Sequence, residues 1–364
     1  MRDIDLFQLA LGLVPPWMVA AANFDAGEKR LDIEIDFKTG GRFACPECGK
    51  ADRPVHDTVK KTWRHLNFFQ HQAFLHARVA RIDCPDCGVR LVNVPWARPG
   101  SGFTLLFEAI VMTLVKDMPV AAAARLVGEH DTRLWRVIQH YVETAVARMD
   151  LSDLRRVAID ETAAKRGQDY ISLFVDIDAR KVVYVTEGND AETVARFADH
   201  VDDHNSDASR IKEVCIDMSG AYIKGVGHNL TEAEITFDKF QAVKLVNDAV
   251  DQVRRAESRE RPELKGSRFL WLKNEGRLTV AQSATLDALT RLNLKTARAY
   301  RIRLAFQEVY NQPSEGWGEL ILDRWYSWAI RSRLEPIKEV ARTINRHRDG
   351  ILRWFDSKIG VSPD

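Results

Sequence analysis

The stretch VAIDE at residues 157–161 ends a short apolar run with acidic residues, and VCID at residues 214–217 ends in the same way. Between these runs the sequence predicts two strands joined by a tight turn and then a helix, at residues 170–176, 182–187 and 192–201. After a helical crossover, the last strand can pair in parallel beside the first. The pattern therefore predicts an α/β domain with Asp160 and Asp217 at one edge of its sheet.

Two carboxylates at one sheet edge can share divalent metal ions. In phosphodiester cleavage, one Mg²⁺ activates the attacking water or 3′-hydroxyl and a second stabilises the leaving oxygen, with the ions about 3.5–4 Å apart. Because acids at strand ends are common, the pattern leaves a second interpretation open. Asp160 and Asp217 would then be solvent-facing residues that cap their strands.

Four of the five cysteines form two Cys-x-x-Cys turns, Cys45 with Cys48 and Cys84 with Cys87, each followed by glycine. Zinc takes four thiolates in a tetrahedron, so two such turns supply one closed site. The long interval between the turns predicts an extended ribbon of strands. Redox-active cysteines are the alternative, although no thioredoxin-like pattern surrounds either pair. We predict one structural zinc ion, and we expect Cys215, in an apolar run, to be a core thiol.

Between the two cysteine turns lies the basic stretch KKTWRH at residues 60–65. Lys60, Lys61 and Arg64 could contact phosphates and release counterions, and Trp63 could stack on a base or wedge between bases. A solvated strand face is the alternative interpretation. The sequence does not decide between them.

Three helices are predicted after the basic stretch, at residues 105–116, 120–126 and 132–149, with Thr132 as the cap of the third. A short turn joins the second helix to the longer third one. This order is typical of a helix-turn-helix, whose second helix enters the major groove of DNA. Arg133, Arg136 and Gln139 could point outward from that helix, and arginine and glutamine read base edges. A plain helical hairpin remains the alternative.

Composition divides the chain of 364 residues into regions, with a linker expected at residues 95–102. The predicted regions are a β-rich zinc-binding module at 1–95, a helix-turn-helix at 103–150, an α/β domain at 155–256, and a helical part at 257–364. Neither a signal peptide nor a membrane-spanning segment is evident, and the paired cysteines suit a reducing compartment, so a cytoplasmic protein is expected. The net charge is only +1, and DNA contacts must therefore come from local patches.

Taken together, these motifs resemble the insertion-sequence transposases of the ISL3 family over most of the chain. The resemblance rests on the two cysteine turns, the helix-turn-helix, and the segments VPWARP at 94–99, IDE at 159–161, DMSGAY at 217–222, DKF at 238–240 and KLVNDAVDQVRR at 244–255. It implies a ribonuclease-H-like catalytic domain with a helical insertion. Asp160 and Asp217 would be the first two ligands of an Asp-Asp-Glu triad that binds Mg²⁺ or Mn²⁺. The implied partners are terminal inverted repeats, target DNA and further copies of the chain.

The sequence departs from the family pattern at two places. In the family, the third acid is the glutamate of a Glu-Gly-x-Asn motif that follows a segment like WFDS at 354–357, and this chain does not contain that motif. The second departure is Gln241, which stands where the family has histidine. We expect a truncated or decayed copy that binds DNA better than it cuts. Glu308 is a candidate substitute for the third acid, with a solvated helix-face glutamate as the alternative. Two other functions stay open, a non-catalytic DNA-binding inhibitor and a zinc-ribbon nuclease unrelated to mobile DNA.

Overall fold

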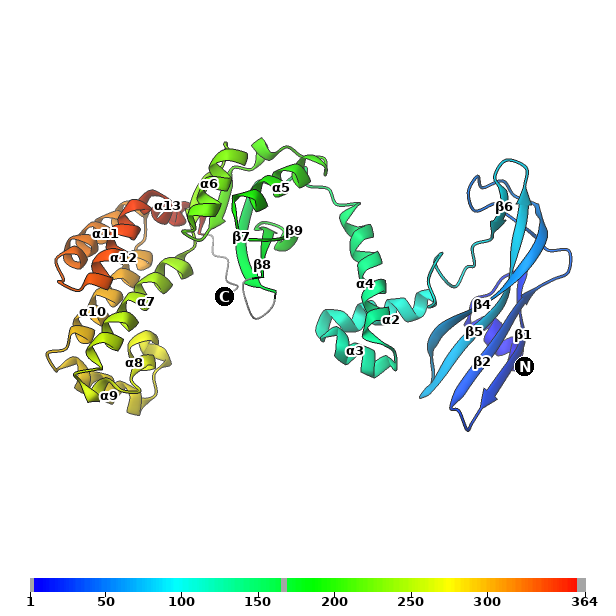
Figure 1. The fold of residues 1–364 in the computed structure, drawn as a ribbon, viewed down its shortest axis with the longest axis horizontal. Coiled ribbons are helices and arrows are strands. Elements are labelled where there is room, and N and C mark those ends of the chain that lie inside the picture. Colours follow the sequence, from blue (N-terminus) through cyan, green and yellow to red (C-terminus); the bar gives the residue numbers. More distant parts are fainter. Residues whose placement is uncertain (1–2, 165–168, 359–364) are drawn as a thin grey trace. The chain divides into compact units, whose positions relative to one another are not determined.

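The structure is a computed structural model that describes residues 3–164 and 169–358. The chain divides into two compact units, an N-terminal unit (Met1–Arg148) and a C-terminal unit (Met149–Asp364), coloured blue to cyan-green and green to red in Figure 1. Each unit has hydrophobic core clusters of its own. No helix within the described ranges is both long and apolar enough to cross a membrane.

The N-terminal unit begins with a six-stranded sheet in the order β1-β2-β5-β4-β3, and β6 pairs with β5. The elements are α1 (Asp3–Ala10), β1 (Trp17–Asp25), β2 (Arg30–Phe37), β3 (Arg42–Phe43), β4 (Arg53–Phe68), β5 (His71–Cys84) and β6 (Gly88–Leu91). Alternation in β2 buries Leu31, Ile33 and Ile35 while the residues between them stay more exposed. The ribbon of strands predicted between the two cysteine turns is confirmed by β4 and β5.

Three helices complete the N-terminal unit, namely α2 (Leu105–Asp117), α3 (Val120–Val127) and α4 (Asp131–Val146). Their core includes Phe107 and Leu134, and left-handed Gly128 ends α3 in the short turn before α4. The predicted helix-turn-helix is therefore present. The prediction that Thr132 caps α4 is wrong, because the helix begins one residue earlier, at Asp131. His130 occupies the cap position and makes no side-chain hydrogen bond there.

The stretch at 95–102, predicted to be a linker, is partly built into the core of the β-sheet. Trp96 is 7% exposed and Ala97 is 4% exposed. The ring of Trp96 meets that of Trp63 edge-on, with 5.6 Å between centroids, and the backbone N–H of Leu105 donates to the Trp96 carbonyl. Sheet and helices are therefore joined by packed residues.

The C-terminal unit begins with a five-stranded sheet in the order β11-β10-β7-β8-β9. The strands are β7 (Arg156–Ala163), β8 (Tyr170–Asp176), β9 (Lys181–Glu187), β10 (Glu213–Ile216) and β11 (Glu234–Phe237). The first three form an antiparallel meander, and β10 and β11 run parallel to β7. This is the ribonuclease-H-like α/β architecture expected from the sequence, which had not indicated β11.

Helices account for most of the remaining chain, as predicted for the helical part at 257–364. They are α5 (Ala191–Asp202), α6 (Gly220–Asn229), α7 (Lys239–Glu257), α8 (Arg268–Leu272), α9 (Val280–Thr290), α10 (Lys295–Gln307), α11 (Glu315–Ile330), α12 (Glu335–Arg346), α13 (Arg348–Leu352) and α14 (Trp354–Ser357), with 3₁₀ turns at Ala208–Arg210, Pro262–Leu264, Glu275–Arg277 and Glu308–Asn311. One buried cluster extends from Val157 and Phe174 in the sheet to Trp271 and Trp325 in the helices. The boundary predicted after residue 256 therefore does not separate two cores.

Gly225 on α6 provides a test of the packing between α5 and α6. A methyl group at this position would lie 2.8 Å from Cγ2 of Val194 and 3.0 Å from the carbonyl oxygen of Ala191, whereas one at Gly227 on the same helix would have no neighbour within 4 Å. We expect Gly225→Ala to destabilise the C-terminal unit by about 1–3 kcal/mol through overpacking. Gly227→Ala should instead stabilise it by up to about 1 kcal/mol through helix propensity.

Urea unfolding followed by circular dichroism measures both changes. Equal stability of the two alanine variants would show that α5 and α6 are not packed as closely as the structure has them.

Candidate functional site

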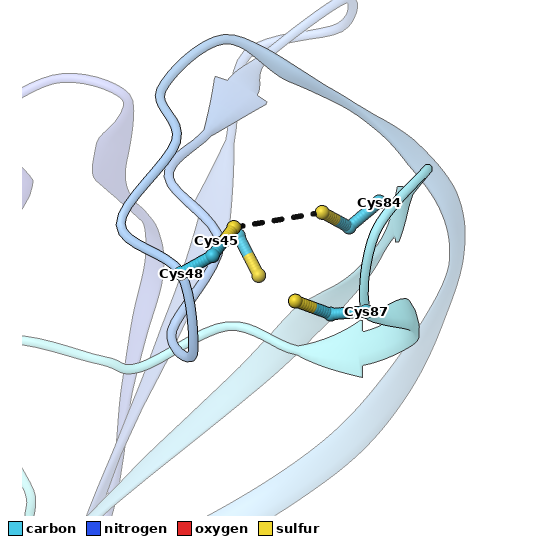
Figure 2. A group of neighbouring side chains, drawn as sticks. All are labelled: Cys45, Cys48, Cys84 and Cys87. Atoms are coloured by element: carbon cyan, nitrogen blue, oxygen red, sulfur yellow. Dashed lines mark hydrogen bonds between the residues drawn. The ribbon is translucent and has the colours of Figure 1, made fainter.

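The four paired cysteines form one compact thiol cluster. Cys45 and Cys48 come from the turn after β3, and Cys84 and Cys87 come from the turn between β5 and β6; Figure 2 shows their side chains converging. All four sulfur atoms lie within 4.8 Å of one another, and those of Cys48 and Cys84 are 3.7 Å apart. Tetrahedral zinc with Zn–S bonds of about 2.3 Å needs sulfurs about 3.8 Å apart. The donor set and its spacing therefore fit one zinc ion.

Two features of the turns hold this cluster in place. The glycines that follow them, Gly49 and Gly88, have φ of 72° and 71°, a left-handed conformation that side chains disfavour. Ion pairs then join one turn to the other, with Lys50 to Asp86 at 2.6 Å and Arg90 to Glu47 at 2.7 Å. These pairs are exposed and add little stability individually, but they fix how the turns face each other.

The thiols of the cluster differ in acidity. A hydrogen bond from the backbone N–H of Cys48, and one from that of Glu47, lower the pKa of Cys45 to about 7. Desolvation and the neighbouring thiols raise the pKa of Cys87 to about 12. A cation is therefore needed before all four sulfurs can be thiolates at neutral pH.

Asp160 lies in β7, and Asp217 directly follows β10, the parallel strand beside it. The register sets Cys215 opposite Ala158, and continuing it by two residues would set Asp217 opposite Asp160. Ile159 lies in the main core, whereas Ala158 and Cys215 pack on the other face of the sheet. Because side chains alternate between faces, both aspartates start on the face of Ala158 and Cys215. Cys215 itself is fully buried, as predicted.

The pKa of Asp217 reflects the acidic groups near it. Burial raises the pKa of Asp217, an N–H donated by Ser219 at 2.9 Å opposes this, and the negative charges of Glu161 and Asp160 raise the pKa further. A raised pKa in the folded state means that stability is lost as the pH rises through that pKa. A divalent cation beside these carboxylates would offset the repulsion.

Two acids near this position were not named as site residues by the sequence analysis. The charge of Glu161 raises the pKa of Asp217 more than the charge of Asp160 does. The carboxylate of Glu161 also accepts a hydrogen bond from Asn189 at 2.9 Å. Asp238 follows β11, whose register with β10 sets it beside Asp217, and it is 3% exposed. Its carboxylate caps α7 by accepting the N–H of Phe240 at 3.1 Å. The sequence signal for Asp238 was an acid ending the short ITF run at 235–237.

The candidate third acid, Glu308, lies directly after α10. It is exposed at the end of α10, where its carboxylate accepts a hydrogen bond from Asn311 at 3.3 Å. Within the described residues, the only group of three or more metal-binding side chains whose ligand atoms lie within 4.8 Å of one another is the cysteine cluster.

The predicted basic stretch divides into exposed and buried residues. Lys60 and Lys61 are exposed on β4, but Arg64 is 2% exposed and Trp63 is 4% exposed. Arg64 donates to the Ala73 carbonyl at 3.2 Å and forms an ion pair with Glu129 at 3.6 Å. The burial of Arg64 and Trp63 favours a structural role over contact with phosphates or bases.

The outward face of α4 carries two of the three predicted side chains. Arg136 and Gln139 are exposed, and Gln139 donates to Glu143 at 2.7 Å. Arg133 is half exposed and packs on the Phe103 ring, with 4.3 Å from its guanidinium carbon to the ring centroid. Trp135, which the sequence analysis did not name, is 55% exposed on the same helix.

Comparison with known families agrees with this arrangement of zinc cluster, helix-turn-helix and acidic sheet edge. Models of three domains match the chain: a zinc finger of insertion-sequence transposases at residues 41–87, the helix-turn-helix domain of transposase family ISL3 at 92–142, and the ISL3 transposase domain at 157–363. The last covers more than half of the chain. The chain belongs to the ISL3 transposase family.

Curated members of the ISL3 family align along most of this chain. The transposase for insertion sequence element IS1557 of Mycobacterium tuberculosis is 30% identical over 98% of this chain and 87% of its own length. The transposase for IS1001 of Bordetella parapertussis is 28% identical over 85% of this chain and 78% of its own length. A simian T-cell lymphotropic virus intasome structure aligns with 51% of this chain and 69% of that chain at 14% identity, but its TM-score of 0.20 carries no structural conclusion.

The cysteine cluster leads to a test by metal analysis. We expect one zinc ion per chain, and Cys45→Ser should lose it and unfold the β-sheet module while the C-terminal unit stays folded, because each unit has its own core. Elemental analysis and circular dichroism measure these outcomes. The matched control is Cys215→Ala, which removes a thiol outside the cluster and should keep the zinc. Zinc-free protein purified without chelators would contradict the assignment.

Arg64 and the two exposed lysines should respond differently to mutation. We expect Arg64→Ala to destabilise the N-terminal unit by about 1–3 kcal/mol, because it removes the hydrogen bond to the Ala73 carbonyl and leaves Glu129 paired with Arg133 alone. Replacing Lys60 and Lys61 by alanine should leave stability unchanged but make duplex binding less salt-dependent, with a slope smaller by up to about 1.8. Thermal unfolding and fluorescence anisotropy separate these effects. A stable Arg64→Ala variant with a reduced salt slope would restore Arg64 as a phosphate contact.

Proposed function

We propose that this chain binds the terminal inverted repeats of an insertion sequence and cleaves DNA strands there with divalent metal ions held by Asp160 and Asp217. The observation that supports the proposal is the parallel pairing of β7 with β10, because Asp160 lies in β7 and Asp217 directly follows β10. Membership of the ISL3 transposase family supports the same reaction class.

Mg²⁺ or Mn²⁺ is the cofactor that this site would take. Oxygen ligands from carboxylates suit both ions. Bound metal would activate an attacking oxygen and stabilise the leaving oxygen of a phosphodiester. The chain's own contribution is to hold Asp160 and Asp217 side by side, with the N–H of Ser219 fixing one oxygen of Asp217.

DNA recognition is assigned to the N-terminal unit. Arg136 and Gln139 are exposed on α4, the second helix of the helix-turn-helix, where such side chains reach base edges. Lys60 and Lys61 would contact phosphates. Arg133 packs on the ring of Phe103 and would help to orient α4. Because this packing covers one face of its guanidinium group, only the remaining N–H groups would contact DNA. Because an element has two ends, we also propose that copies of the chain assemble on DNA.

A second function is favoured by one specific observation. The described residues contain no group of three carboxylates whose oxygens all lie within 4.8 Å of one another, although Glu161 and Asp238 lie near Asp217. A metal ion held by fewer ligands is positioned less well, and misplacement by about 1 Å can cost on the order of 100-fold in rate. The alternative is therefore a DNA-binding protein that occupies the element's ends without cleaving them.

A nicking assay distinguishes these functions. Purified chain is incubated with labelled terminal repeats and Mg²⁺ or Mn²⁺, and Asp160→Asn and Asp217→Asn should each reduce nicking by about 100-fold or more while duplex affinity stays unchanged. The control is Asp248→Asn, the same chemical change at an exposed acid on α7, which should cleave normally.

Thermal unfolding gives an independent readout of metal binding. Mg²⁺ should raise the melting temperature of the unmodified chain and of Asp248→Asn, but not that of Asp217→Asn, because only binding to the folded state stabilises it. Strong duplex binding without any nicking would favour the second function. Equal nicking by Asp160→Asn and the unmodified chain would overturn the metal site.

A further inference from the structure

Helix α11 leaves two tryptophans in solvent. Trp317 is 57% exposed and Trp328 is 42% exposed, whereas Trp325 on the same helix is 2% exposed within the core. Large aromatic side chains dominate the energetics of cores and interfaces, so two of them exposed on one helix indicate a surface that meets a partner.

The exposed tryptophans lie on one face together with positive charge. Trp317, Leu320, Arg324 and Trp328 follow the spacing i, i+3, i+7 and i+11, which aligns them along one side of an α-helix. Arg331, one residue beyond the end of α11, continues the same line. We call these five residues the tryptophan–arginine face.

Charge is segregated around this helix. Glu319 and Asp323 lie on another flank, and Arg348 forms an ion pair with each of them at 2.8 Å. Among the residues that the structure describes, Arg324 and Arg331 have no ion-pair partner, and the guanidinium of Arg331 donates hydrogen bonds to Ser327 of α11. The tryptophan–arginine face is therefore both aromatic and positively charged, without acids to neutralise it.

We propose that the tryptophan–arginine face of α11 binds an unpaired DNA strand, with Trp317 and Trp328 stacking on bases and Arg324 and Arg331 contacting phosphates. Aromatic side chains interleaved with arginine are the general chemistry of single-strand binding. In a duplex the bases are stacked on one another, so exposed indole rings suit a strand that has left the helix. This inference rests on the proposed cleavage of DNA, which frees such strands at the element's ends.

The dimensions of α11 set how the strand is held. The two tryptophans are eleven residues apart, about 16 Å along the helix axis, so they would stack on bases several nucleotides apart. The guanidinium groups would then contact the backbone that joins those bases.

Fluorescence anisotropy with labelled oligothymidylate, and with a fully paired terminal-repeat duplex, tests this inference on the full chain. Trp317→Ala combined with Trp328→Ala should weaken oligothymidylate binding by at least about 25-fold, because each lost base stack costs at least about 5-fold, while duplex binding is unchanged. Arg324→Gln combined with Arg331→Gln should lower the salt-dependence slope for the single strand by about 1.4. Phe269→Ala is the control, because Phe269 is an exposed aromatic beside Arg268 on α8.

Three results would overturn the inference. One is oligothymidylate binding by both double variants within 2-fold of the unmodified chain. A second is an equal loss in the Phe269→Ala control. The third is a shift from oligomer to monomer in analytical ultracentrifugation of the tryptophan variant without loss of DNA affinity, which would make this face an interface between copies. If the unmodified chain itself neither bound the duplex nor nicked it, the proposed function would be refuted instead. Failure of this inference and failure of the proposed function are therefore distinguishable.

Discussion

The parallel pairing of β7 with β10 is the interaction on which the C-terminal unit depends. It closes the crossover through α5, and it sets residues 157 and 214 side by side beneath a shared core. The same register carries Asp160 and Asp217 to one face of the sheet. A slip by one residue would send one of the aspartates into the opposite face, because side chains alternate along a strand.

The cost of this arrangement is visible at Asp217. Burial and the charges of Glu161 and Asp160 raise its pKa, so the folded chain holds a destabilising group at neutral pH without metal. Functional sites commonly retain such groups, because the repulsion that destabilises the fold is what attracts a cation. Asp238 adds a further buried acid at the next strand, where it also caps α7.

A buried arginine has a comparable organising role in the N-terminal unit. Arg64 lies between β4 and the helix-turn-helix, bonded to the Ala73 carbonyl and paired with Glu129. Its backbone also accepts and donates hydrogen bonds with Thr104 and Gly102. The helix that presents Arg136 and Gln139 is thus attached to the sheet that carries the cysteine cluster, although the sequence suggested a linker between them.

Elements whose sequence patterns involve only near neighbours could be predicted from the sequence alone. Cysteine spacing, strand alternation near 31–36 and the helical periods of the helix-turn-helix all depend on near neighbours. Tertiary structure decided what depends on distant partners: the burial of Arg64, the strand β11, the solvent position of Glu308, and the exposure of Trp317 beside the burial of Trp325. The local sequence around a strand arginine is the same whether its side chain faces water or a buried glutamate. Its surroundings are set by the packing of elements that are far apart in the chain.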